Sequence, residues 1–394
     1  MSRFDLIEAA QLKQEIRTFL SAHWSLDRQM EAMARQAEDA ISVEEEREFW
    51  KLLGDQGWLG LGIPEEYGGS GGSALHRHLF TEEVNYYGAP FPRTAVTIVA
   101  PAMLSYASEE MKHRFLPRIA RGEINFALGY TEPEAGTDLA NLSTRAVAGN
   151  DGYRINGQKL YTTRAHRSSY CWLAARTNPD AKKHAGISLF IVDLAAPGVH
   201  IQRLEAFNGE STNITFYDDV LVPEADRVGA ENEGWTYITG ALGLERIGSL
   251  PLGRIRRVYD EIVKFSRTGG VGGRSLASEP EFRWMLADYQ IEMRALESLF
   301  QGAVDEIDES GELSGHVAAA IKTFLTEFKY RLCDEVLRYV GREAQLSLGP
   351  DQSDFLVLLD SVWRDAVVEK FGGGTNEIQR DIVAIHGLGL PRSR

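Results

Sequence analysis

This sequence has few cysteines, no long apolar run and no secretion or transit pattern near its start. The two cysteines, Cys171 and Cys333, are far apart and fit neither a metal-ligand nor a disulfide spacing, which favours a reducing compartment. No stretch reaches the length of a membrane span. The segment MSRFDLIEAA has no apolar signal core and no Arg- and Ser-rich transit pattern. We therefore expect a cytoplasmic protein without a membrane span.

Positive charge is also scarce. Lysine and arginine number 42 against 57 aspartates and glutamates, which gives a net charge of −15. No block of basic residues is long enough for a nucleic-acid surface, so an anionic ligand would need local donors. What the chain does have is length: 394 residues, 43% of them hydrophobic, suffice for two or three domains with cores that need no disulfide or metal.

Three blocks of pattern follow each other along the chain. Apolar residues recur at helical spacing from about residue 4 to residue 128, and short runs rich in Val, Ile, Thr and aromatic residues follow, with turn signals between them. Helical spacing then returns in four long segments. We predict an α+β protein with an N-terminal helical domain (1–128), a middle β-sandwich or barrel domain (129–232) and a C-terminal four-helix bundle (233–394).

Local signals add detail to this outline. Ser108 stands where a helix N-cap is expected, and Asn156-Gly157 predicts a two-residue hairpin turn. The segment HRH at 76–78 has close spacing without a further ligand cluster, so we read it as surface and expect no metal site.

Six motifs occur in order along the chain: GYTEPEAGTDLANLSTRA (129–146), GQKLYTT (157–163), FYDDVLVP (216–223), NEGW (232–235), GLERI (243–247) and WRDAVVEKFGGGTNEIQRDIVAIHGLGLPR (363–392). This series resembles the acyl-CoA dehydrogenase family of flavoenzymes over roughly residues 10 to 392. The resemblance implies the same three-domain fold, with FAD between the β domain and the bundle, usually in tetramers. It also implies removal of the α-proton and β-hydride of an acyl-CoA to give a trans-2-enoyl-CoA, with an electron-transfer flavoprotein as oxidant.

The reaction needs a base for the weakly acidic α-proton. In much of the family this base is a glutamate just before the Gly-Thr of the last motif, and that position here is Gly373. A second family pattern, in branched-chain and long-chain members, places the glutamate on the first bundle helix before an arginine, and Glu245-Arg246 matches it. The same helix face is small and mostly apolar, which would raise the carboxyl pKa and leave room for substrate. The alternative is a solvated Glu-Arg pair.

Three glycines, Gly372 to Gly374, lead into the polar stretch that closes this motif. The resemblance implies that the N–H of Gly373 donates to the thioester carbonyl as an oxyanion-hole group. Gly372 replaces a residue that is bulky in straight-chain members, so both glycines widen the pocket and favour a branched, cyclic or otherwise bulky acyl group. The alternative is a helix-entry loop that only needs conformational freedom.

The resemblance also implies the flavin contacts. The ring system would meet Tyr130, Thr131, Gly136, Thr137, Tyr161, Thr162 and Thr163. The ribityl chain and pyrophosphate would meet Gly374, Thr375, Asn376 and Glu377, near a helix N-terminus. Equivalents on the adenosine side, which would reach a neighbouring subunit, are Arg267 and Arg274.

Several residues depart from the family pattern. Arg164, directly after the motif GQKLYTT, replaces the asparagine that is usual in the family there. The family's adenosine-side motifs are matched only in part, by SRTGGVGGRSL and RYVGREAQL. These departures leave open a homo-oligomer, a heteromer with a related subunit, and a non-catalytic, partner-dependent subunit. Another flavin chemistry, such as monooxygenation or desulfination, needs no α-proton base, and Glu245-Arg246 argues against it.

The basic segment GRIRRV (253–258) could meet coenzyme A phosphates or be solvated. The sequence does not select the acyl group.

Overall fold

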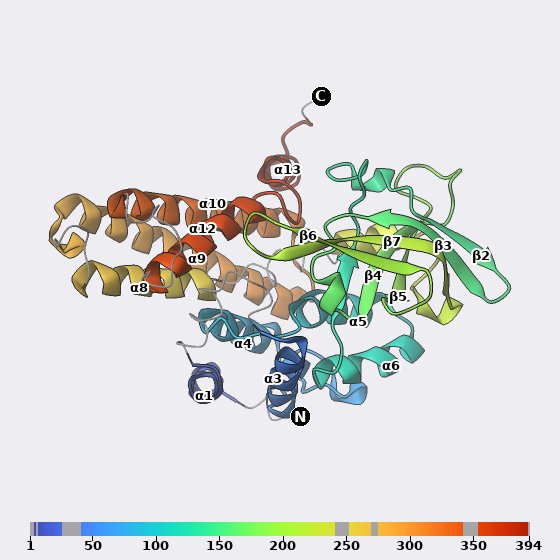
Figure 1. Cartoon of the computed structure of the whole chain (residues 1–394), viewed down its shortest axis with the longest axis horizontal. Coiled ribbons are helices and arrows are strands. Elements are labelled where there is room, and N and C mark those ends of the chain that lie inside the picture. The colour runs from blue at the N-terminus through green and yellow to red at the C-terminus, as the bar shows by residue number, and fades with distance from the viewer. Residues whose placement is uncertain are drawn as a thin grey trace.

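The structure is a computed structural model that describes residues 4, 7–25, 41–240, 252–268, 275–341 and 354–392, without the side chains of Thr268 and Asp354. It has the predicted order of helices, strands and helices, and Figure 1 shows the N-terminal helices below, the bundle on one side and the β domain on the other. Within this described part, none of the helices combines the length and apolar character needed to cross a bilayer.

The helical elements alternate with short turns in the N-terminal domain and are long in the bundle. The α-helices are α1 (Ala9–His23), α3 (Val43–Asp55), α4 (Ala74–Tyr86), α5 (Ala100–Tyr106), α6 (Glu109–Ala120), α8 (Gly253–Thr268), α9 (Pro280–Ser310), α10 (Gly315–Val340), α12 (Asp354–Glu369) and α13 (Asn376–Ile382). Two π-helical turns lie at Ala95–Val99 and Val383–Gly387. The predicted N-cap is confirmed, because the Ser108 hydroxyl accepts a hydrogen bond from the N–H of Met111 at 3.2 Å.

The strands form one mainly antiparallel sheet in the order β6-β7-β3-β2-β4-β5-β8, with β1 also paired to β4. Their bounds are β1 (Phe126–Gly129), β2 (Arg145–Gly149), β3 (Gly152–Lys159), β4 (Tyr170–Arg176), β5 (Ile187–Asp193), β6 (Val199–Glu205), β7 (Ser211–Val222) and β8 (Arg227–Val228). The strand β5 is apolar from Leu189 to Val192 because both of its faces are buried there: Leu189 faces one core and Phe190 another.

The prediction of a hairpin turn at Asn156-Gly157 is wrong. The turn between β2 and β3 lies earlier, at Asn150 and Asp151, and β3 continues through Asn156-Gly157 with a shift in its pairing with β7. Gly157 has φ +149°, and a Cβ there would lie 2.5 Å from the Thr144 hydroxyl, so glycine serves a bulge and a close approach rather than a turn. An Asn-Gly pair satisfies either demand, which is why the sequence alone misplaced the turn.

The described residues form three hydrophobic cores that hold the fold together. The first joins the N-terminal helices to one face of the sheet, so that Trp58 and Trp172 belong to one cluster. The second fills the other face of the sheet around Phe190, and the third lies inside the bundle, around Phe300 and Phe328. The N-terminal and β domains therefore share apolar packing, whereas the bundle has a core of its own.

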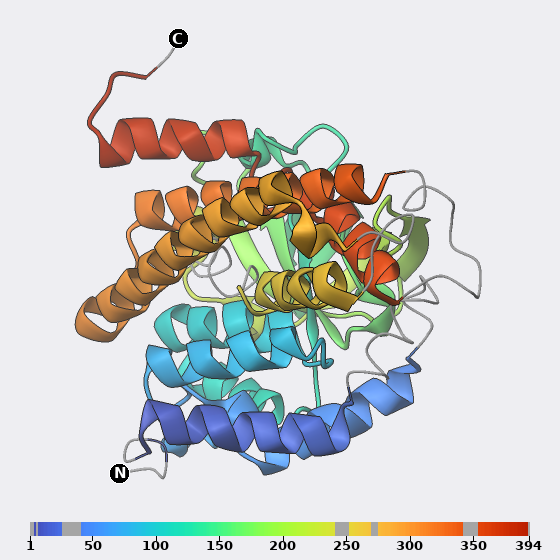
Figure 2. The same ribbon diagram turned by 90° about the vertical axis from the view of Figure 1, so that its left-hand side faces the viewer.

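The bundle joins the N-terminal domain through polar caps at two helix ends. The carboxylate of Asp308, on α9, accepts from the first N–H groups of α4, with Ala74 N at 2.7 Å. In return, Glu82 on α4 accepts from Leu252 N at 2.6 Å, directly before α8. These caps satisfy donors that a helix start leaves unpaired, and Figure 2 shows α4 lying along the lower side of the bundle.

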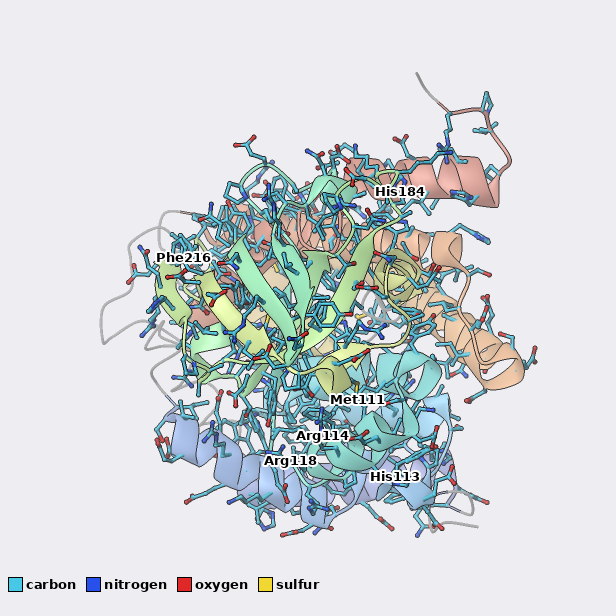
Figure 3. The ribbon with its side chains drawn as sticks, turned by 90° about the vertical axis from the view of Figure 1, so that its right-hand side faces the viewer. Met111, His113, Arg114, Arg118, His184 and Phe216 are labelled. Atoms are coloured by element: carbon cyan, nitrogen blue, oxygen red, sulfur yellow. The ribbon has the colours of Figure 1, made fainter. Side chains whose placement is uncertain are left out.

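The β domain has polar links to both of its neighbours. Asn208, in the loop between β6 and β7, donates to the carboxylate of Asp365 on α12 at 2.9 Å. On the opposite side, Arg114 of α6 pairs with Asp226, and Arg118 donates to the Tyr170 hydroxyl at 3.1 Å. Figure 3 shows both arginines where α6 meets the β domain. The three domains are thus tied together at the ends and edges of their elements.

Glu82 should make stability depend on pH. Burial raises its pKa to about 7, against the opposing effect of Arg256 and the hydrogen bond from Leu252. The folded chain therefore holds this proton more tightly than the unfolded chain, so the stability that Glu82 contributes is full below pH 4.5 and is lost as pH rises through 7. Glu82→Gln keeps the acceptor but removes the titration. We expect the wild-type free energy of unfolding to fall by about 3 kcal/mol relative to the variant between pH 4.5 and 8.

The free energy of unfolding is measured by urea titration at each pH, and Glu83→Gln is the matched control. Its carboxylate is buried too, but Arg17 and Arg256 outweigh the burial and lower its pKa. The contribution of Glu83 is therefore present above pH 4.5 and lost only below it. Equal pH slopes for wild type and Glu82→Gln would contradict the assignment to Glu82.

Candidate active site

The two motifs expected to meet the flavin ring lie side by side. The backbone N–H of Leu160 donates to the carbonyl of Thr131 at 2.8 Å, and the Lys159 ammonium donates to the carbonyl of Tyr130 at 3.0 Å. These bonds join the end of β1 to the end of β3, which are far apart in sequence. The structure therefore brings 130–137 and 161–163 to one edge of the sheet.

A buried ion pair beneath this edge stabilises its conformation. Lys159 and Glu132 are both buried, and Lys159 Nζ lies 2.8 Å from Glu132 Oε1. Glu132 also accepts from the N–H groups of Ser143, at 2.6 Å, and Thr144, at 2.9 Å. Burial alone would raise the pKa of Glu132, but Lys159 and these donors outweigh it and hold the pKa at about 2. The carboxylate thus stays charged and fixes the course of the YTEPEAGTD loop.

The outward face of this edge suits a flavin. Tyr161 has φ +55° and is 60% exposed, so a strained backbone presents an aromatic ring to the surface. Gly136, Thr137 and Thr163 are exposed as well. Thr162 differs, because its side chain is buried and its hydroxyl lies 3.3 Å from that of Thr215. Exposed hydroxyls, open backbone and an aromatic face are the groups that a flavin ring needs, so these residues fit the cofactor.

The replacement of the usual asparagine by Arg164 is explained by the contacts of the arginine side chain. Its backbone is left-handed, with φ +60° and ψ +20°, a conformation in which asparagine is favoured over long side chains. The guanidinium compensates with an ion pair to Glu46 on α3, at 2.6 Å, which Arg167 also approaches at 3.3 Å. Arg164 thereby ties the predicted flavin edge to the N-terminal domain.

The triple glycine forms a turn between α12 and α13. Gly373 has φ +64° and Gly374 φ +91°, and a Cβ on Gly374 would lie 2.6 Å from Gln379. The backbone alone is therefore reason enough for glycine at these two positions. Gly372 is different, because a Cβ there would meet only the Val368 carbonyl at 3.9 Å, an ordinary contact. Among the described residues, no acceptor takes a hydrogen bond from the N–H of Gly373.

A second buried lysine fixes this turn. Lys322, on α10, is 1% exposed, and its Nζ donates to the carbonyls of Lys370 (3.1 Å) and Gly374 (2.8 Å) and to Asn376 Oδ1 (2.7 Å). A cation at the C-terminal end of α12 is also favoured by the helix dipole. Gln379 adds a bond from its amide to the carbonyl of Gly373 at 3.1 Å. The loop that carries the predicted oxyanion donor is thus held through its carbonyl groups.

The residues after the turn face different ways. Thr375 caps α13, and its hydroxyl accepts from Ile378 N at 3.4 Å. The side chain of Asn376 is buried and bonds to Thr326 and Glu327 on α10, so any contact of Asn376 with the ribityl chain would come from its backbone. Glu377 is exposed, and hydrogen bonds from its own N–H and from Thr375 lower its pKa. A carboxylate suits ribityl hydroxyls rather than a pyrophosphate.

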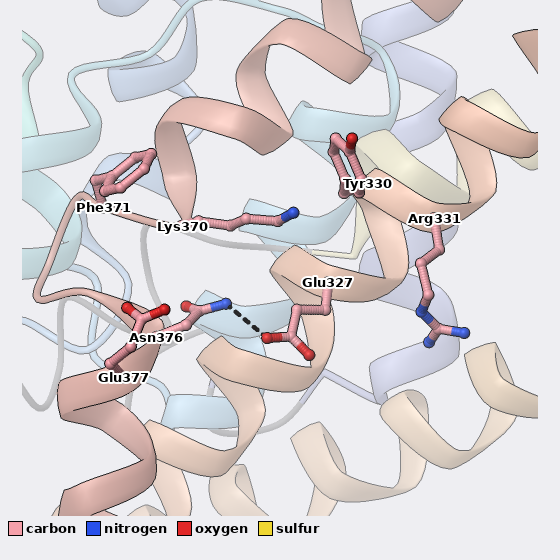
Figure 4. Close-up of a pocket in the computed structure, with 7 residues that line it drawn as sticks. All are labelled: Glu327, Tyr330, Arg331, Lys370, Phe371, Asn376 and Glu377. Atoms are coloured by element: carbon pink, nitrogen blue, oxygen red, sulfur yellow. Dashed lines mark hydrogen bonds between the residues drawn. The ribbon is translucent and has the colours of Figure 1, made fainter.

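Beside the turn lies a cavity of about 350 Å³, drawn in Figure 4. Its lining residues are Glu327, Tyr330, Arg331, Lys370, Phe371, Asn376 and Glu377. The Lys370 ammonium lies over the Tyr330 ring, 3.4 Å from its centre. Charges of both signs line this space, so it suits a polar ligand and not an apolar acyl chain.

Other predicted site residues lie elsewhere or cannot be placed. Glu245, Arg246 and Arg274 fall outside the described residues. Arg267 is exposed in the last turn of α8. The arginines of GRIRRV form ion pairs with carboxylates of this chain and do not point into an open ligand site. The pairs are Arg254 with Asp365, Arg256 with Glu82 and Glu83, and Arg257 with Glu261.

The HRH segment lies in α4, where its histidines have structural roles. His76 closes a capping box with Ser73, and His78 is stacked on Phe300 of the bundle. Burial and the nearby Arg256 and Lys13 lower the pKa of His78 to about 4, so its imidazole is neutral. Within the described ranges, no group of His, Cys, Asp or Glu has the arrangement of a metal site.

The motifs did not single out Lys322 or Glu132, although the sequence carries one signal. On α10, Lys322, Thr326 and Lys329 recur at helical spacing and all three are buried. Polar residues at core spacing in a long helix indicate internal hydrogen bonds, here to the ends of α12 and α13. Lys329, for example, pairs with Glu369 at 2.6 Å.

Removal of the Lys322 ammonium should weaken flavin binding. Lys322→Met leaves three buried oxygens without this donor, so the turn at 372–376 loses its fixed course. We expect FAD affinity to fall about tenfold or more while helix content is retained, as measured by flavin titration and circular dichroism.

Lys329→Met is the control, because it removes a buried lysine of the same helix that pairs with Glu369 and not with the glycine turn. It should lower stability and leave FAD affinity nearly unchanged. Equal FAD affinities of Lys322→Met and wild type would contradict the role of Lys322.

Comparisons with known proteins agree with this geometry. The acyl-CoA dehydrogenase N-terminal, middle and C-terminal domain models match residues 8–123, 127–220 and 232–388. The chain is 37% identical to acyl-CoA dehydrogenase FadE26 of Mycobacterium tuberculosis over 393 residues, 97% of either chain. The solved structure of the Tcur3481-Tcur3483 steroid ACAD has a TM-score of 0.88 at 36% identity and 98% coverage of both chains.

A second solved structure, the ChsE4-ChsE5 complex from Mycobacterium tuberculosis, has a TM-score of 0.86 at 36% identity, again with 98% coverage of both chains. The domain models together account for most of the chain, in the order that the motifs predicted. The residues at the sheet edge also suit the cofactor of this family. The chain therefore belongs to the acyl-CoA dehydrogenase family and is an FAD-dependent enzyme that dehydrogenates acyl-CoA thioesters.

Proposed function

We propose that this chain converts a bulky, branched or cyclic acyl-CoA to its trans-2-enoyl-CoA, with Glu245 as the base. The observation that carries the proposal is the glycine turn. At the position where much of the family has its basic glutamate, Gly373 has no side chain, and its N–H has no acceptor among the described residues. The carboxylate must then come from elsewhere, and Glu245 is the residue that matches the second family pattern.

In this proposal the N–H of Gly373 donates to the thioester carbonyl as negative charge develops there, and Glu245 takes the α-proton. FAD, when bound, accepts the β-hydride. Lys322 and Gln379 hold the turn from behind, so the donor keeps its direction during the reaction. Glu82 fixes Leu252, which follows the Glu245 segment directly, through a 2.6 Å hydrogen bond.

The size of the acyl group is inferred from Gly372. A side chain there would meet only an ordinary contact within this chain, so the fold does not require glycine at that position. An open position beside the proposed oxyanion donor favours a wide acyl group. The similar Tcur3481-Tcur3483 structure is that of a steroid ACAD, which supports a ring system of steroid size. We therefore propose a substrate with a bulky cyclic acyl portion.

An electron-transfer flavoprotein is the proposed electron acceptor. The assembly is either a homo-oligomer or a heteromer with a related subunit, and the two-chain composition of the ChsE4-ChsE5 structure supports the heteromer. The partial adenosine motifs support an assembly in which the chain depends on its partner to hold FAD fully. Arg267 is exposed at the end of α8, where a neighbouring subunit could use it.

Glu245→Gln tests the base. The amide has nearly the shape of the carboxylate but cannot accept the α-proton, so turnover should fall by about 10³-fold or more while FAD remains bound. The visible spectrum of the purified holoprotein gives the readout: wild type bleaches with the right member of an acyl-CoA panel, and the variant does not. Bleaching of the variant at the wild-type rate would disprove the role of Glu245. A colourless wild-type chain that binds no added FAD on its own would favour an assembly in which a related subunit is needed to hold FAD.

Gly372→Ala tests the acyl class. The added methyl group has room within the fold, so stability should change by less than about 1 kcal/mol. It would intrude on the proposed pocket, so kcat/KM should fall about tenfold or more for cyclic acyl-CoAs and little for straight-chain ones. An equal loss for both substrate classes in steady-state assays would contradict the proposal.

A further inference from the structure

The loop between β6 and β7 carries a carboxylate, that of Glu210, without a hydrogen-bond donor. The backbone N–H of Glu210 donates to Asn208 Oδ1 at 3.3 Å, but among the described residues no donor bonds to its side chain. The side chain reaches solvent, yet protein atoms surround it closely enough that desolvation, followed by repulsion from Asp365, raises its pKa. The protein thus leaves the acceptors of a crowded carboxylate unsatisfied, which is costly unless a ligand supplies a donor.

Glu210 lies where all three domains meet. Arg93 of the N-terminal domain, Arg164 of the β domain and Arg254 of the bundle are all near enough to lower its pKa, against the larger effect of desolvation. Figure 1 shows the end of the β6–β7 hairpin beside α12 of the bundle, to which the loop is bonded. We call these three arginines and Glu210 the three-domain junction.

Two arginines of the junction are already paired with other carboxylates. Arg164 donates to Glu46 at 2.6 Å, and Arg254 lies 2.6 Å from the carboxylate of Asp365. The loop itself is attached to α12 through Asn208, which donates to the same aspartate at 2.9 Å. The unpartnered carboxylate is therefore not needed to hold the domains together, and it remains available to a ligand.

The three-domain junction adjoins both halves of the candidate active site. Glu210 is two residues before Thr212, whose hydroxyl lies 3.3 Å from that of Thr163 on the predicted flavin edge. On the bundle side, Asp365 precedes Gly372 by seven residues, about 10 Å along a helix. The carboxylate is thus within reach of a bulky acyl group whose thioester lies at the glycine turn.

We propose that Glu210 accepts a hydrogen bond from a hydroxyl group on the cyclic acyl portion of the substrate, and so selects hydroxylated ring systems. This inference rests on the proposed function, because it takes the acyl group to be cyclic and its thioester to lie at Gly373. A cationic substituent would be repelled by the three arginines of the junction, whereas a hydroxyl supplies a donor without a further charge. The analogue without this hydroxyl would leave the carboxylate unpaired and be disfavoured.

Steady-state turnover of matched substrates by the full-length holoprotein tests this role. The substrates are fused-ring acyl-CoAs that differ only in the position of one ring hydroxyl, with the ring without a hydroxyl as the reference. For wild type we expect kcat/KM to be about tenfold higher or more for one hydroxyl position than for the reference, the effect of one hydrogen bond to a charged group. Glu210→Ala should lose this preference and leave kcat/KM for the reference nearly unchanged.

Asp218→Ala serves as the control. Asp218 is an exposed carboxylate of the same strand, β7, and lies eight residues beyond Glu210, about 25 Å along an extended chain. This variant should keep the hydroxyl preference of wild type. A Glu210→Ala variant that also keeps the preference would overturn the proposal, as would a wild type that turns over the reference but prefers no hydroxyl position.

Urea unfolding separates this role from a structural one. The raised pKa means that the surroundings of Glu210 disfavour its charge, so Glu210→Ala without substrate should be at least as stable as wild type. A less stable variant that loses kcat/KM equally for the reference and the hydroxylated substrates would overturn the proposal. A wild type that turns over straight-chain acyl-CoAs and no cyclic ones would instead overturn the acyl class in the proposed function, and this inference with it.

Discussion

The buried ammonium of Lys322 is the contact on which the site depends. It joins the carbonyl of Lys370, directly after α12, to the turn at 372–374 and to the start of α13, so one side chain of α10 fixes three segments. A turn made of three glycines has high conformational entropy and would not keep one shape by itself. The proposed oxyanion donor, the N–H of Gly373, would therefore be held in place by a cation that lies behind a flexible backbone.

Much of the fold could be predicted from the sequence because its signals are local. Helical spacing and the Ser108 cap identified the helices, and turn residues marked off the strands. The hairpin at Asn156-Gly157 was misplaced because a bulge and a turn make the same demand on glycine. The division into three cores could not be predicted, since it depends on which faces meet after folding, as Leu189 and Phe190 show in adjacent positions.

The site was predictable only where a motif names it. The ordered motifs pointed to Tyr161 and Gly373, but nothing in them said that Asn376 turns inward to α10 or that Thr162 is buried. Those orientations follow from long-range hydrogen bonds, which no short window of sequence contains. Arg164 illustrates the same limit: its departure from asparagine makes sense only with Glu46, 118 residues earlier, beside it.

The polar joint between α4 and the bundle also bears on how the protein is made. Glu82 leaves the ribosome 170 residues before its partner Leu252, so until that residue is made its carboxylate lacks this hydrogen bond. In the folded chain, burial raises the pKa of Glu82 to about 7, and burial together with Arg256 and Lys13 lowers that of His78 to about 4. Folding of the newly made chain is therefore accompanied by proton exchange with the surrounding solution.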